Sequence, residues 1–372
     1  METRNFRVRL HVLSPIHIGC DEIYEPTSFV IDEKKKKLIE FDPLELVKNL
    51  SPQERAEFNK IAAGDNFLHI FKTIKRFYKP AIKGREVEIT DYLVSHYKKI
   101  LDMGTFDKKA VINQFTINKT AYNPYTNQPY IPGSSLKGAI RTAYLNAVAK
   151  VKDVTKFKGG SDELESFLLE RQEGKLKMAT DPFRMIKVSD FLPVENVKTK
   201  IIYAINRKKR KSERETLVER GGVYQIFEVI QPGAIFAGMM NIDTPLNSSG
   251  IKLPINADEL MASLKNFYNP LLEKEINTLK SIDISMALMD EIHDKFREKL
   301  DKTAFIVSIG RHSGAEAVTI DGKRKIKIMQ GRYNKPAFLD HSTTLWLASE
   351  TPKPENNSSL IPFGWAVIEL ID

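Results

Sequence analysis

The sequence predicts an α+β fold built on antiparallel sheets, and three observations lead to this class. Residues 6–12 alternate strictly between apolar side chains and Arg7, Arg9 and His11, which is the period of a half-buried strand with a cationic second face. Other strand-like segments occur as adjacent pairs, and the interval 223–240 is broken by a Pro-Gly turn. Helical and strand-like blocks interleave without a repeated strand–helix unit, which favours antiparallel over doubly wound parallel sheets.

The individual elements follow from periodicity and from the turn residues between them. Helical periodicity predicts helical blocks at 43–103, 134–148 and 257–300. Apolar runs bounded by Gly, Pro or polar clusters predict further strands at 27–31, 37–41, 110–117, 185–188, 200–205, 223–240, 305–309, 344–347 and 365–371. The strongly charged segment 207–222 is predicted to be a mobile loop or a hairpin tip.

The length of 372 residues is typical of two domains, or of one large elaborated domain. We place the first domain at 1–245, with a helical insertion at about 43–108, and the second at 246–372. A hydrophobic fraction of 42% is ordinary for globular proteins and is sufficient for a buried core.

The overall charge and the single cysteine restrict the class of protein. Lys and Arg number 57 against 48 Asp and Glu, and the resulting charge of +9 suits a polyanionic partner such as nucleic acid. Cys20 alone can form no internal disulfide and no thiolate-rich zinc site, so a reducing compartment is expected. The N-terminal residues do not resemble a signal peptide, and no apolar run approaches the roughly 18 residues of a membrane helix. We therefore expect a cytoplasmic protein with no membrane partner and no cofactor.

The segment YIPGSSLKGAIRT at 130–142 carries the most specific pattern in the chain. Its apolar residues and those that follow recur at helical spacing as one buried stripe: Leu136, Ala139, Ile140, Ala143, Tyr144, Ala147 and Val148. Ser134 or Ser135 is placed to cap the helix. The opposite face carries small and polar residues, namely Ser134, Lys137, Gly138 and Arg141. Free N–H groups, hydroxyls and two cations one turn apart predict a phosphate-binding site, where the glycine lets a sugar-phosphate chain approach.

Other interpretations of this helix compete with phosphate binding. An ordinary capped amphipathic helix with a solvated Lys and Arg has the same spacing, and spacing alone does not separate the two. Gly133 and Gly138 have the separation of a P-loop, but Ala139 and Ile140 stand where that motif requires Lys and Ser or Thr. Nucleotide hydrolysis is therefore not expected.

Two further groups are candidates for contact with nucleic acid or for catalysis. His17, at the end of the first strand, is interpreted as a structural turn histidine, with general-base chemistry as the less favoured alternative. Arg311, His312 and Ser313 lie in a loop bracketed by glycines, where direct contact with RNA competes with a simple loop cap. The strands carry no aromatic pattern of the kind that RRM domains use for base stacking.

Two basic runs and the aromatic residues near the terminus complete the candidates. Lys208 and Arg210 belong to a dense basic run at 207–214, and such runs are usually solvated loops. The basic run at 323–327 alternates in a way that indicates an exposed strand edge. Phe363 and Trp365 are interpreted as residues of the core or of a subunit interface.

The motif PGSSLKGAIR at 132–141 resembles the RAMP superfamily of CRISPR-associated proteins, whose members carry a Pro-Gly-Ser-Ser-Leu-Lys-Gly-x-x-Arg helix. The turn SPIHIG at 14–19, the loop GRHSG at 310–314 and the closing PFGW at 362–365 are similar to further features of these proteins. With only Gly310 and Gly314 around Arg-His-Ser, this loop contains fewer glycines than the glycine-rich loop of filament subunits. Within the superfamily, the combination most resembles the fifth subunit of type III-A Csm interference complexes.

This resemblance implies ferredoxin-like, RRM-related modules, one in each predicted domain. It also implies a non-catalytic subunit that binds CRISPR RNA, caps the filament at its 3′ side and supports RNA maturation and antiviral defence. The implied partners are neighbouring Csm filament subunits, target RNA and host maturation nucleases. The run around Lys208 and Arg210 stands where related subunits have a protruding hairpin, which implies contact with the guide–target duplex.

An enzyme of the same superfamily is the alternative: a metal-independent endoribonuclease with His17 or His312 as acid–base groups. Asp21 and Glu22 stand roughly where filament subunits carry a catalytic Asp, but no second acid or metal cluster is identifiable in the sequence. In the resembled family the loop at 310–314 lies near the motif helix. We therefore expect both to clamp one stretch of RNA, with Arg141 and Arg311 exposed.

Overall fold

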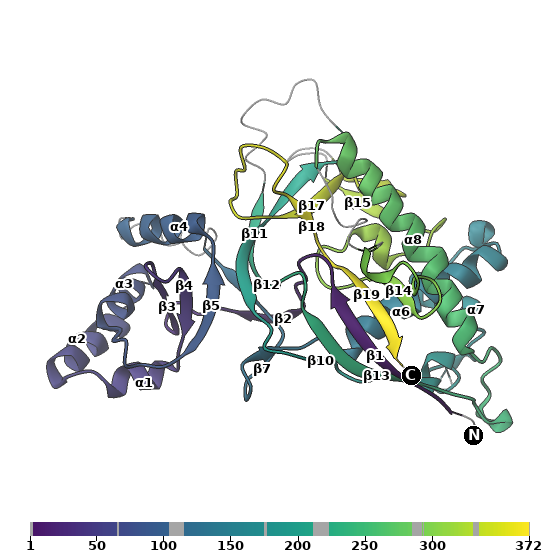
Figure 1. Cartoon of the computed structure of the whole chain (residues 1–372), viewed down its shortest axis with the longest axis horizontal. Coiled ribbons are helices and arrows are strands. Elements are labelled where there is room, and N and C mark those ends of the chain that lie inside the picture. Colours follow the sequence, from purple (N-terminus) through teal and green to yellow (C-terminus); the bar gives the residue numbers. More distant parts are fainter. Residues whose placement is uncertain are drawn as a thin grey trace.

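The computed structural model describes residues 3–64, 67–103, 115–174, 177–210, 223–284, 292, 294–329 and 335–371. Within these ranges two large β-sheets lie side by side, and helices cover them and project from them (Figure 1). The predicted mixture of helices and mainly antiparallel sheets is confirmed. None of the described helices is long and apolar enough to cross a membrane.

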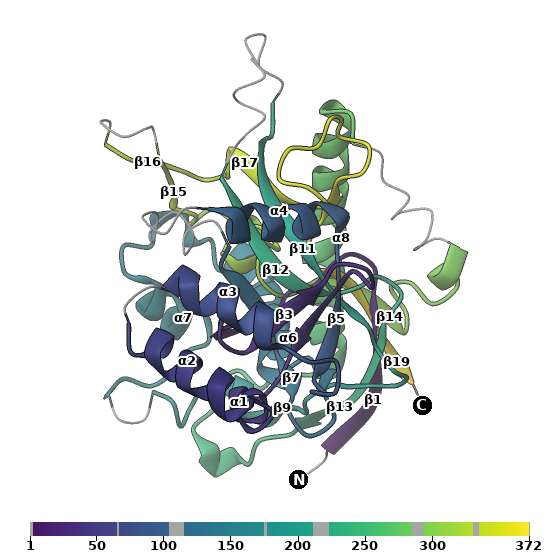
Figure 2. The same ribbon diagram turned by 90° about the vertical axis from the view of Figure 1, so that its left-hand side faces the viewer.

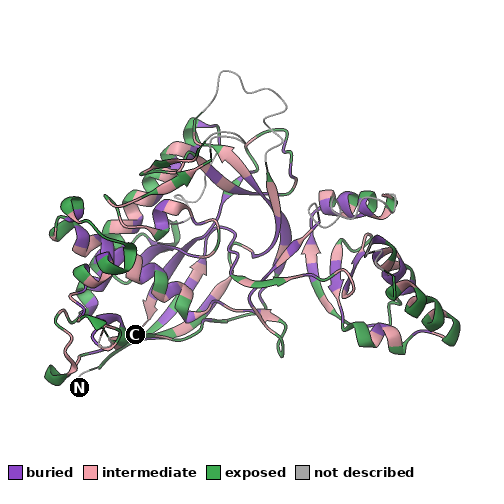
Figure 3. Cartoon of the chain, turned by 180° about the vertical axis from the view of Figure 1, so that it is seen from behind, coloured by how far each residue is buried: buried purple, intermediate pink, exposed green. Residues whose placement is uncertain are grey.

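The helices differ in how much of their surface the rest of the chain covers. The α-helices are α1 (Pro43–Lys48), α2 (Pro52–Ala62), α3 (Phe67–Phe77), α4 (Asp91–Asp102), α6 (Gly133–Val151), α7 (Ser161–Leu168) and α8 (Ala257–Ser281). Short 3-10 helices are η1 (Val154–Lys156), η3 (Pro182–Met185), η5 (Asn247–Ser249) and η6 (Ala315–Val318). Helices α6 and α8 pack against each other and bury one side each, whereas α2 buries no side chain (Figure 3).

The first large sheet is antiparallel throughout. Its strands are β1 (Thr3–Val12), β9 (Ile186–Val188), β10 (Leu192–Pro193), β13 (Ile235–Asp243), β14 (Ala304–Ser308) and β19 (Trp365–Ile371). They lie in the order β10–β13–β1–β19–β14, with β9 also paired to β13. The alternation predicted for β1 is confirmed, because Val8, Leu10 and Val12 are buried under α6 and α8 while Arg7 and Arg9 are exposed.

The second large sheet contains two parallel pairs among antiparallel ones. Its strands are β2 (Gly19–Ile23), β3 (Phe29–Asp32), β4 (Lys37–Glu40), β5 (Arg85–Ile89), β6 (Ile117–Thr120), β11 (Thr199–Lys208), β12 (Tyr224–Ile230), β17 (Thr344–Ser349) and β18 (Ile361–Pro362). The order is β2–β6–β12–β11–β5–β4–β3, and the far end of β11 also pairs with β17. Two small ribbons complete the strands: β7 (Tyr122–Asn123) with β8 (Gln128–Pro129), and β15 (Ile326–Ile328) with β16 (Ala337–Leu339).

The predicted insertion projects from the body as a separate lobe that carries α1 to α4 (Figure 1). It is not wholly helical, because β5 pairs with β4 and, in parallel, with β11. A buried ionic contact fastens the lobe at this point. The Arg85 guanidinium pairs with the fully buried carboxylate of Glu228, which also accepts a hydrogen bond of 2.9 Å from the Tyr24 hydroxyl.

Other departures from the predicted elements concern where they begin and end. The strand predicted at 110–117 falls mostly outside the described residues, and β6 begins at its last position. Of the helix predicted at 257–300, α8 covers Ala257–Ser281, and among the later described positions 292 and 294–296 are again helical. The predicted boundary at residue 245 lies between β13 and α8, and each large sheet takes strands from both sides of it.

Candidate nucleic-acid interface

Helix α6 begins at Gly133, before both predicted capping serines. The Gly133 N–H donates to Asp190 Oδ1 at 2.8 Å. A side chain at this glycine would collide with the backbone carbonyls of residues 188–189, so its role is close packing of the helix start against β9. The predicted cap by Ser134 or Ser135 is therefore wrong. The Asp190 carboxylate therefore accepts a hydrogen bond from one of the N–H groups that we expected to bind phosphate.

The remaining polar face of α6 is open at its first turn. Ser134 and Gly138 are exposed, and Ser135 and Lys137 are half-buried. A Cβ placed on Gly138 would meet no atom within 4 Å, so a chain of sugar and phosphate can approach the helix here. Lys137 forms no ion pair within the described part of the chain, and partial burial lowers its pKa. An incompletely solvated cation without a counter-ion is suited to an anionic ligand.

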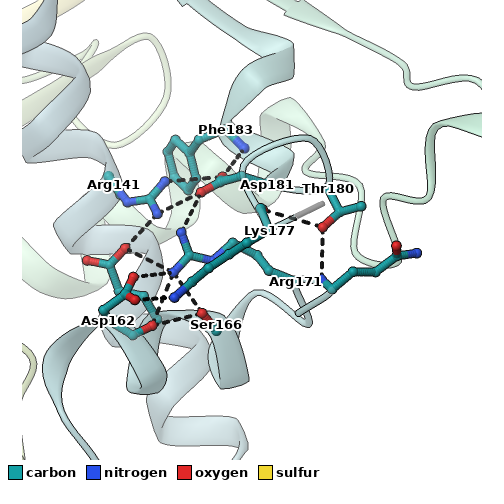
Figure 4. A network of polar contacts seen from close by, with 10 residues as sticks. Arg141, Asp162, Ser166, Arg171, Lys177, Thr180, Asp181 and Phe183 are labelled. Atoms are coloured by element: carbon teal, nitrogen blue, oxygen red, sulfur yellow. Dashed lines mark hydrogen bonds and ion pairs between the residues drawn. The ribbon is translucent and has the colours of Figure 1, made fainter. Parts of the chain in front are cut away.

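Arg141, by contrast, belongs to an ionic network inside the chain (Figure 4). Its guanidinium contacts the carboxylates of Glu165 at 2.6 Å and Asp181 at 2.9 Å. The guanidinium of Arg171 reaches the same Asp181 oxygen at 3.1 Å, and the side chains of Asp181 and Arg171 are only 6% and 4% exposed. The expectation that Arg141 is exposed is wrong. This side chain joins α6 to α7 and to the turn that begins η3.

His17 lies buried at the turn after β1, with 1% of its surface exposed. Its Nδ1 lies 2.8 Å from the Glu228 carbonyl oxygen, and its ring centroid lies 4.4 Å from that of Phe227. Burial lowers its pKa, and the nearby charge of Arg311 acts in the same direction. The interpretation of His17 as a structural turn histidine agrees with this geometry.

The glycine-rich loop is fastened directly onto this turn. Gly310 adopts φ 84°, and a Cβ on it would lie 2.6 Å from the His17 carbonyl oxygen, so only glycine fits. The next N–H, that of Arg311, donates to the same oxygen at 2.9 Å. The Arg311 side chain is exposed, with its guanidinium 5.2 Å from the Phe227 ring centroid. It forms no ion pair among the described residues.

The other two loop residues are engaged within the protein. Ser313 is buried, and its hydroxyl donates to the Gly310 carbonyl at 2.9 Å, so it stabilises the loop. His312 has φ 68° and places Nε2 3.2 Å from Gln225 Oε1. Burial, followed by the charge of Arg311, lowers the pKa of His312 to about 3. The imidazole is therefore neutral at physiological pH.

The basic run meets the glycine-rich loop beside α8. Arg210 and Ser313 line one cleft of about 760 Å³ with Glu275 and Lys209, and Lys209 pairs with Glu316 at 2.7 Å.

Burial raises the pKa of Glu275 to about 7, although Trp365 Nε1 donates to it at 2.8 Å. Trp365 and Phe363 were interpreted as residues of the core or of a subunit interface, and both lie in the core.

The rest of this run is only partly described. Lys208 is exposed at the end of β11, where it stands opposite Thr344. Positions 211–222 lie outside the described residues. Only the base of the predicted hairpin can therefore be placed.

The motif helix contacts the segment after the loop. The Asn146 amide donates to the Thr319 carbonyl at 3.2 Å and accepts from the Asp321 N–H at 2.8 Å. Beside these contacts lies a groove of about 710 Å³, and its basic lining residues are Arg141, Lys158, Lys323, Arg324 and Lys325. A clamp between α6 and the loop itself stays a prediction.

Asp21 and Glu22, the two acids considered for catalysis, lie at the surface, and Glu22 shares the ammonium of Lys119 with Glu40. Asp21 is exposed with φ 57°, and Glu22 lies 3.6 Å from the ammonium of Lys119. Among the residues that the structure describes, no group of three or more His, Cys, Asp or Glu side chains is arranged to hold a metal ion.

The family of the chain follows from comparison with known proteins. The model of the RAMP superfamily matches residues 9–311, and the chain belongs to this superfamily. Two curated relatives are described as "CRISPR system Cms protein Csm5". That of Streptococcus thermophilus is 30% identical over 209 residues, 52% of this chain and about half (53%) of the relative. That of Methanocaldococcus jannaschii is 23% identical over 407 residues, 98% of this chain and 89% of the relative.

Solved structures show the same fold. A chain of the cryo-EM structure of a Csm–crRNA–target RNA ternary complex in a type III-A CRISPR–Cas system matches with TM-score 0.60 and 18% identity, covering 99% of this chain and 100% of that one. The crystal structure of T. onnurineus Csm5 matches with TM-score 0.52 and 17% identity, over 81% and 89%. The predicted resemblance to the RAMP superfamily and to its fifth Csm subunit is confirmed.

Proposed function

We propose that the chain is a non-catalytic RNA-binding subunit of a type III-A Csm complex in the cytoplasm. In this role it caps the complex at the 3′ side of the CRISPR RNA and supports maturation of that RNA and antiviral defence. The observation that carries the proposal is the agreement in fold, over 99% of this chain, with one chain of a Csm–crRNA–target RNA complex. Its proposed partners are CRISPR RNA, neighbouring filament subunits, target RNA and maturation nucleases.

Three cations support contact with the RNA backbone. Lys137 and Arg311 have no ion-pair partner among the described residues, and Arg210 lines a cleft together with the glycine-rich loop. Charges left without counter-ions on a folded surface favour a polyanion, because the ligand replaces lost hydration with direct contacts. Gly138 removes the steric obstacle beside Lys137.

The low pKa of His312 and the burial of His17 support a subunit without catalytic activity. A general acid or base works best with a pKa near the operating pH, whereas the pKa of His312 is about 3. His17 is covered by the loop and is 1% exposed. An RNA in contact with the outer surface of the loop therefore does not reach His17 without movement of the backbone.

A ferredoxin-like architecture is proposed for the first sheet. The order β10–β13–β1–β19, with α6 following β1 and α8 following β13, supports a β-α-β-β-α-β arrangement in which β14 is added at the edge. The two-module division at residue 245 stays a prediction, and this arrangement crosses it because α8 and β19 lie beyond that position.

Binding by the backbone is tested through the salt dependence of affinity. For wild type, the logarithm of affinity for single-stranded RNA should fall linearly with the logarithm of salt, by roughly 0.7 per phosphate neutralised. Lys137→Ala should flatten this slope by about one contact, with little change in base preference. Lys150→Ala, an exposed lysine in the last turn of the same helix, is the matched control and should leave the slope unchanged. Affinity that does not depend on salt would refute the proposal.

The absence of catalysis is tested separately. Repeat-containing RNA is incubated with the purified chain in chelator and compared with a mock preparation. Site-specific cleavage that disappears in His17→Ala or His312→Ala would establish the endoribonuclease instead.

A further inference from the structure

An aromatic pocket lies beside the glycine-rich loop and has no part in the backbone contacts proposed above. It encloses about 400 Å³ between β15, β17 and the loop, and its lining includes Trp346, His312, Phe363 and Lys327. The strands β15 and β17 that form its walls stand close together at the upper edge of the molecule (Figure 2). This volume lies within the range of about 300–1,000 Å³ typical of small-molecule sites.

The aromatic wall is rigid and partly uncovered. The rings of His312 and Trp346 stack with centroids 4.5 Å apart and planes inclined by 22°. Phe227 and Phe363 support the imidazole from behind, with centroids at 5.2 and 5.6 Å. The contact of 3.2 Å between Gln225 Oε1 and His312 Nε2 fixes the orientation of the imidazole. Trp346 itself is half-buried, so its indole keeps surface available to a ligand.

The charges around the wall suit an anionic molecule with a neutral flat group. Lys327, on the pocket-forming strand β15, is exposed and forms no ion pair among the described residues. The Trp346 N–H likewise has no hydrogen-bond acceptor within the described ranges and can donate to a ligand. His312 is neutral, because burial lowers its pKa to about 3, and it therefore presents an aromatic face without charge.

We propose that this pocket receives a nucleobase of single-stranded RNA, stacked on the Trp346–His312 pair, with Lys327 at the adjoining phosphate. The inference rests on the proposed function and adds a base-binding site to it. Every base has an aromatic face, so such a platform binds unpaired RNA with little sequence preference. A duplex cannot enter in this way because its bases are already stacked and paired.

A protein side chain is the competing occupant. The pocket combines an aromatic platform with an exposed cation, and no carboxylate lies in its lining except Glu275, whose pKa is raised to about 7. An aromatic face beside a free cation is complementary to a base attached to a phosphate, whereas an apolar side chain would leave Lys327 without a partner. These observations favour RNA.

The test compares Trp346→Ala with wild type on two probes of about 16 nucleotides, oligoadenylate and an abasic ribose-phosphate chain of equal length. The full chain is used throughout. On oligoadenylate, affinity should fall by between about 5- and 150-fold, the range that base–aromatic stacking implies. On the abasic chain it should not change. Trp346→Phe should retain most of the affinity, and Tyr125→Ala, which removes a side chain of a residue 95% exposed in the β7–β8 turn, is the control.

Tryptophan fluorescence provides a second readout that needs no disruptive variant. The chain has two tryptophans, and Trp365 is 1% exposed. Quenching by oligoadenylate but not by the abasic chain should therefore come from Trp346 and should be lost in Trp346→Phe. Equal affinity of Trp346→Ala and wild type for oligoadenylate, without quenching, would overturn the base site. If Trp346→Ala no longer co-purified with a neighbouring subunit but kept the RNA affinity of wild type, the base site would likewise be overturned, and the pocket would receive a protein side chain instead. If wild type binds neither probe, the proposed function itself fails.

Discussion

Replacing Arg141 by alanine separates a structural role of the motif arginine from a role in RNA binding. The side chain is 23% exposed and contacts Asp181, which is 6% exposed, and Glu165. Its guanidinium also lies 4.8 Å from the Phe183 ring centroid. The substitution removes these contacts and leaves the buried carboxylate with Arg171 as its remaining ion-pair partner among the described residues.

The expected loss of stability depends on which partners the Asp181 and Glu165 carboxylates keep after Arg141 is removed. Breaking a fully buried ion pair costs about 3–5 kcal/mol because the partner charge is left uncompensated. Here Asp181 keeps Arg171 and a hydrogen bond of 2.9 Å from the Phe183 N–H, and Glu165 is 33% exposed and can be hydrated. We therefore expect a smaller loss of about 1.5–3 kcal/mol, the range for hydrogen bonds to charged groups.

Chemical denaturation of the full chain measures this loss, with Lys137→Ala as the matched control on the same helix. The control should change stability by less than about 0.5 kcal/mol, because its side chain has no ion-pair partner within the described residues. An Arg141→Ala variant with the stability of wild type but a flatter salt dependence of RNA binding would refute the reasoning. In that case the guanidinium would serve RNA and not the network.

The pH dependence provides a further check on the same contact. Burial disfavours ionisation of Asp181, but the hydrogen bonds and charge of Arg141 outweigh it and lower the pKa of the carboxyl. The stabilisation is therefore complete above the ordinary Asp pKa of about 3.9 and is lost as the pH falls through the lowered value. The difference in stability between wild type and Arg141→Ala should narrow over that interval, and a difference that is constant with pH would count against the ion pair.

The remaining predictions concern two glycines, a buried acid and a histidine. Gly310→Ala should lower stability by about 1–3 kcal/mol through its φ of 84° and the collision with the His17 carbonyl, measured by denaturation. Gly138→Ala should instead stabilise α6 by up to about 1 kcal/mol yet weaken RNA binding, and unchanged affinity would show that RNA passes elsewhere. Glu228→Ala should cost about 3–5 kcal/mol, because it leaves Arg85 buried without its main partner. The lowered pKa of His312 means that the unfolded chain binds the proton first, so stability should fall as the pH drops from 6.5 towards about 3, and His312→Gln should remove part of this dependence.

Much of the fold was accessible from local patterns. The alternation in β1, the strands β3 and β4, the break between β12 and β13 and the strand β19 were all predicted within a few residues. These elements have a strict period or a Pro-Gly turn, and both are properties of neighbouring residues. By contrast, β5 was missed, because five residues between helices form a strand here only by pairing with β4 and β11.

The candidate site was predicted less completely. Residue types in the motif indicated phosphate binding and the superfamily, and Lys137 and Gly138 are placed as that interpretation requires. Trp346 was missed, because a single tryptophan in a strand has no pattern that distinguishes a core residue from a ligand platform. The serine cap failed because Asp190, 57 positions from Gly133, supplies the acceptor instead.

The sequence by itself determined the elements with a clear period, the basic character and the membership in a superfamily, since each depends on composition or on residues close together in the chain. The tertiary structure alone decided the partners of individual side chains. Arg141 meets Asp181 across 40 positions, and His312 meets Trp346 through the packing of a loop on a strand. The physical reason is that a charged or aromatic side chain takes the partner that packing brings within a few ångströms, and local sequence does not encode that partner.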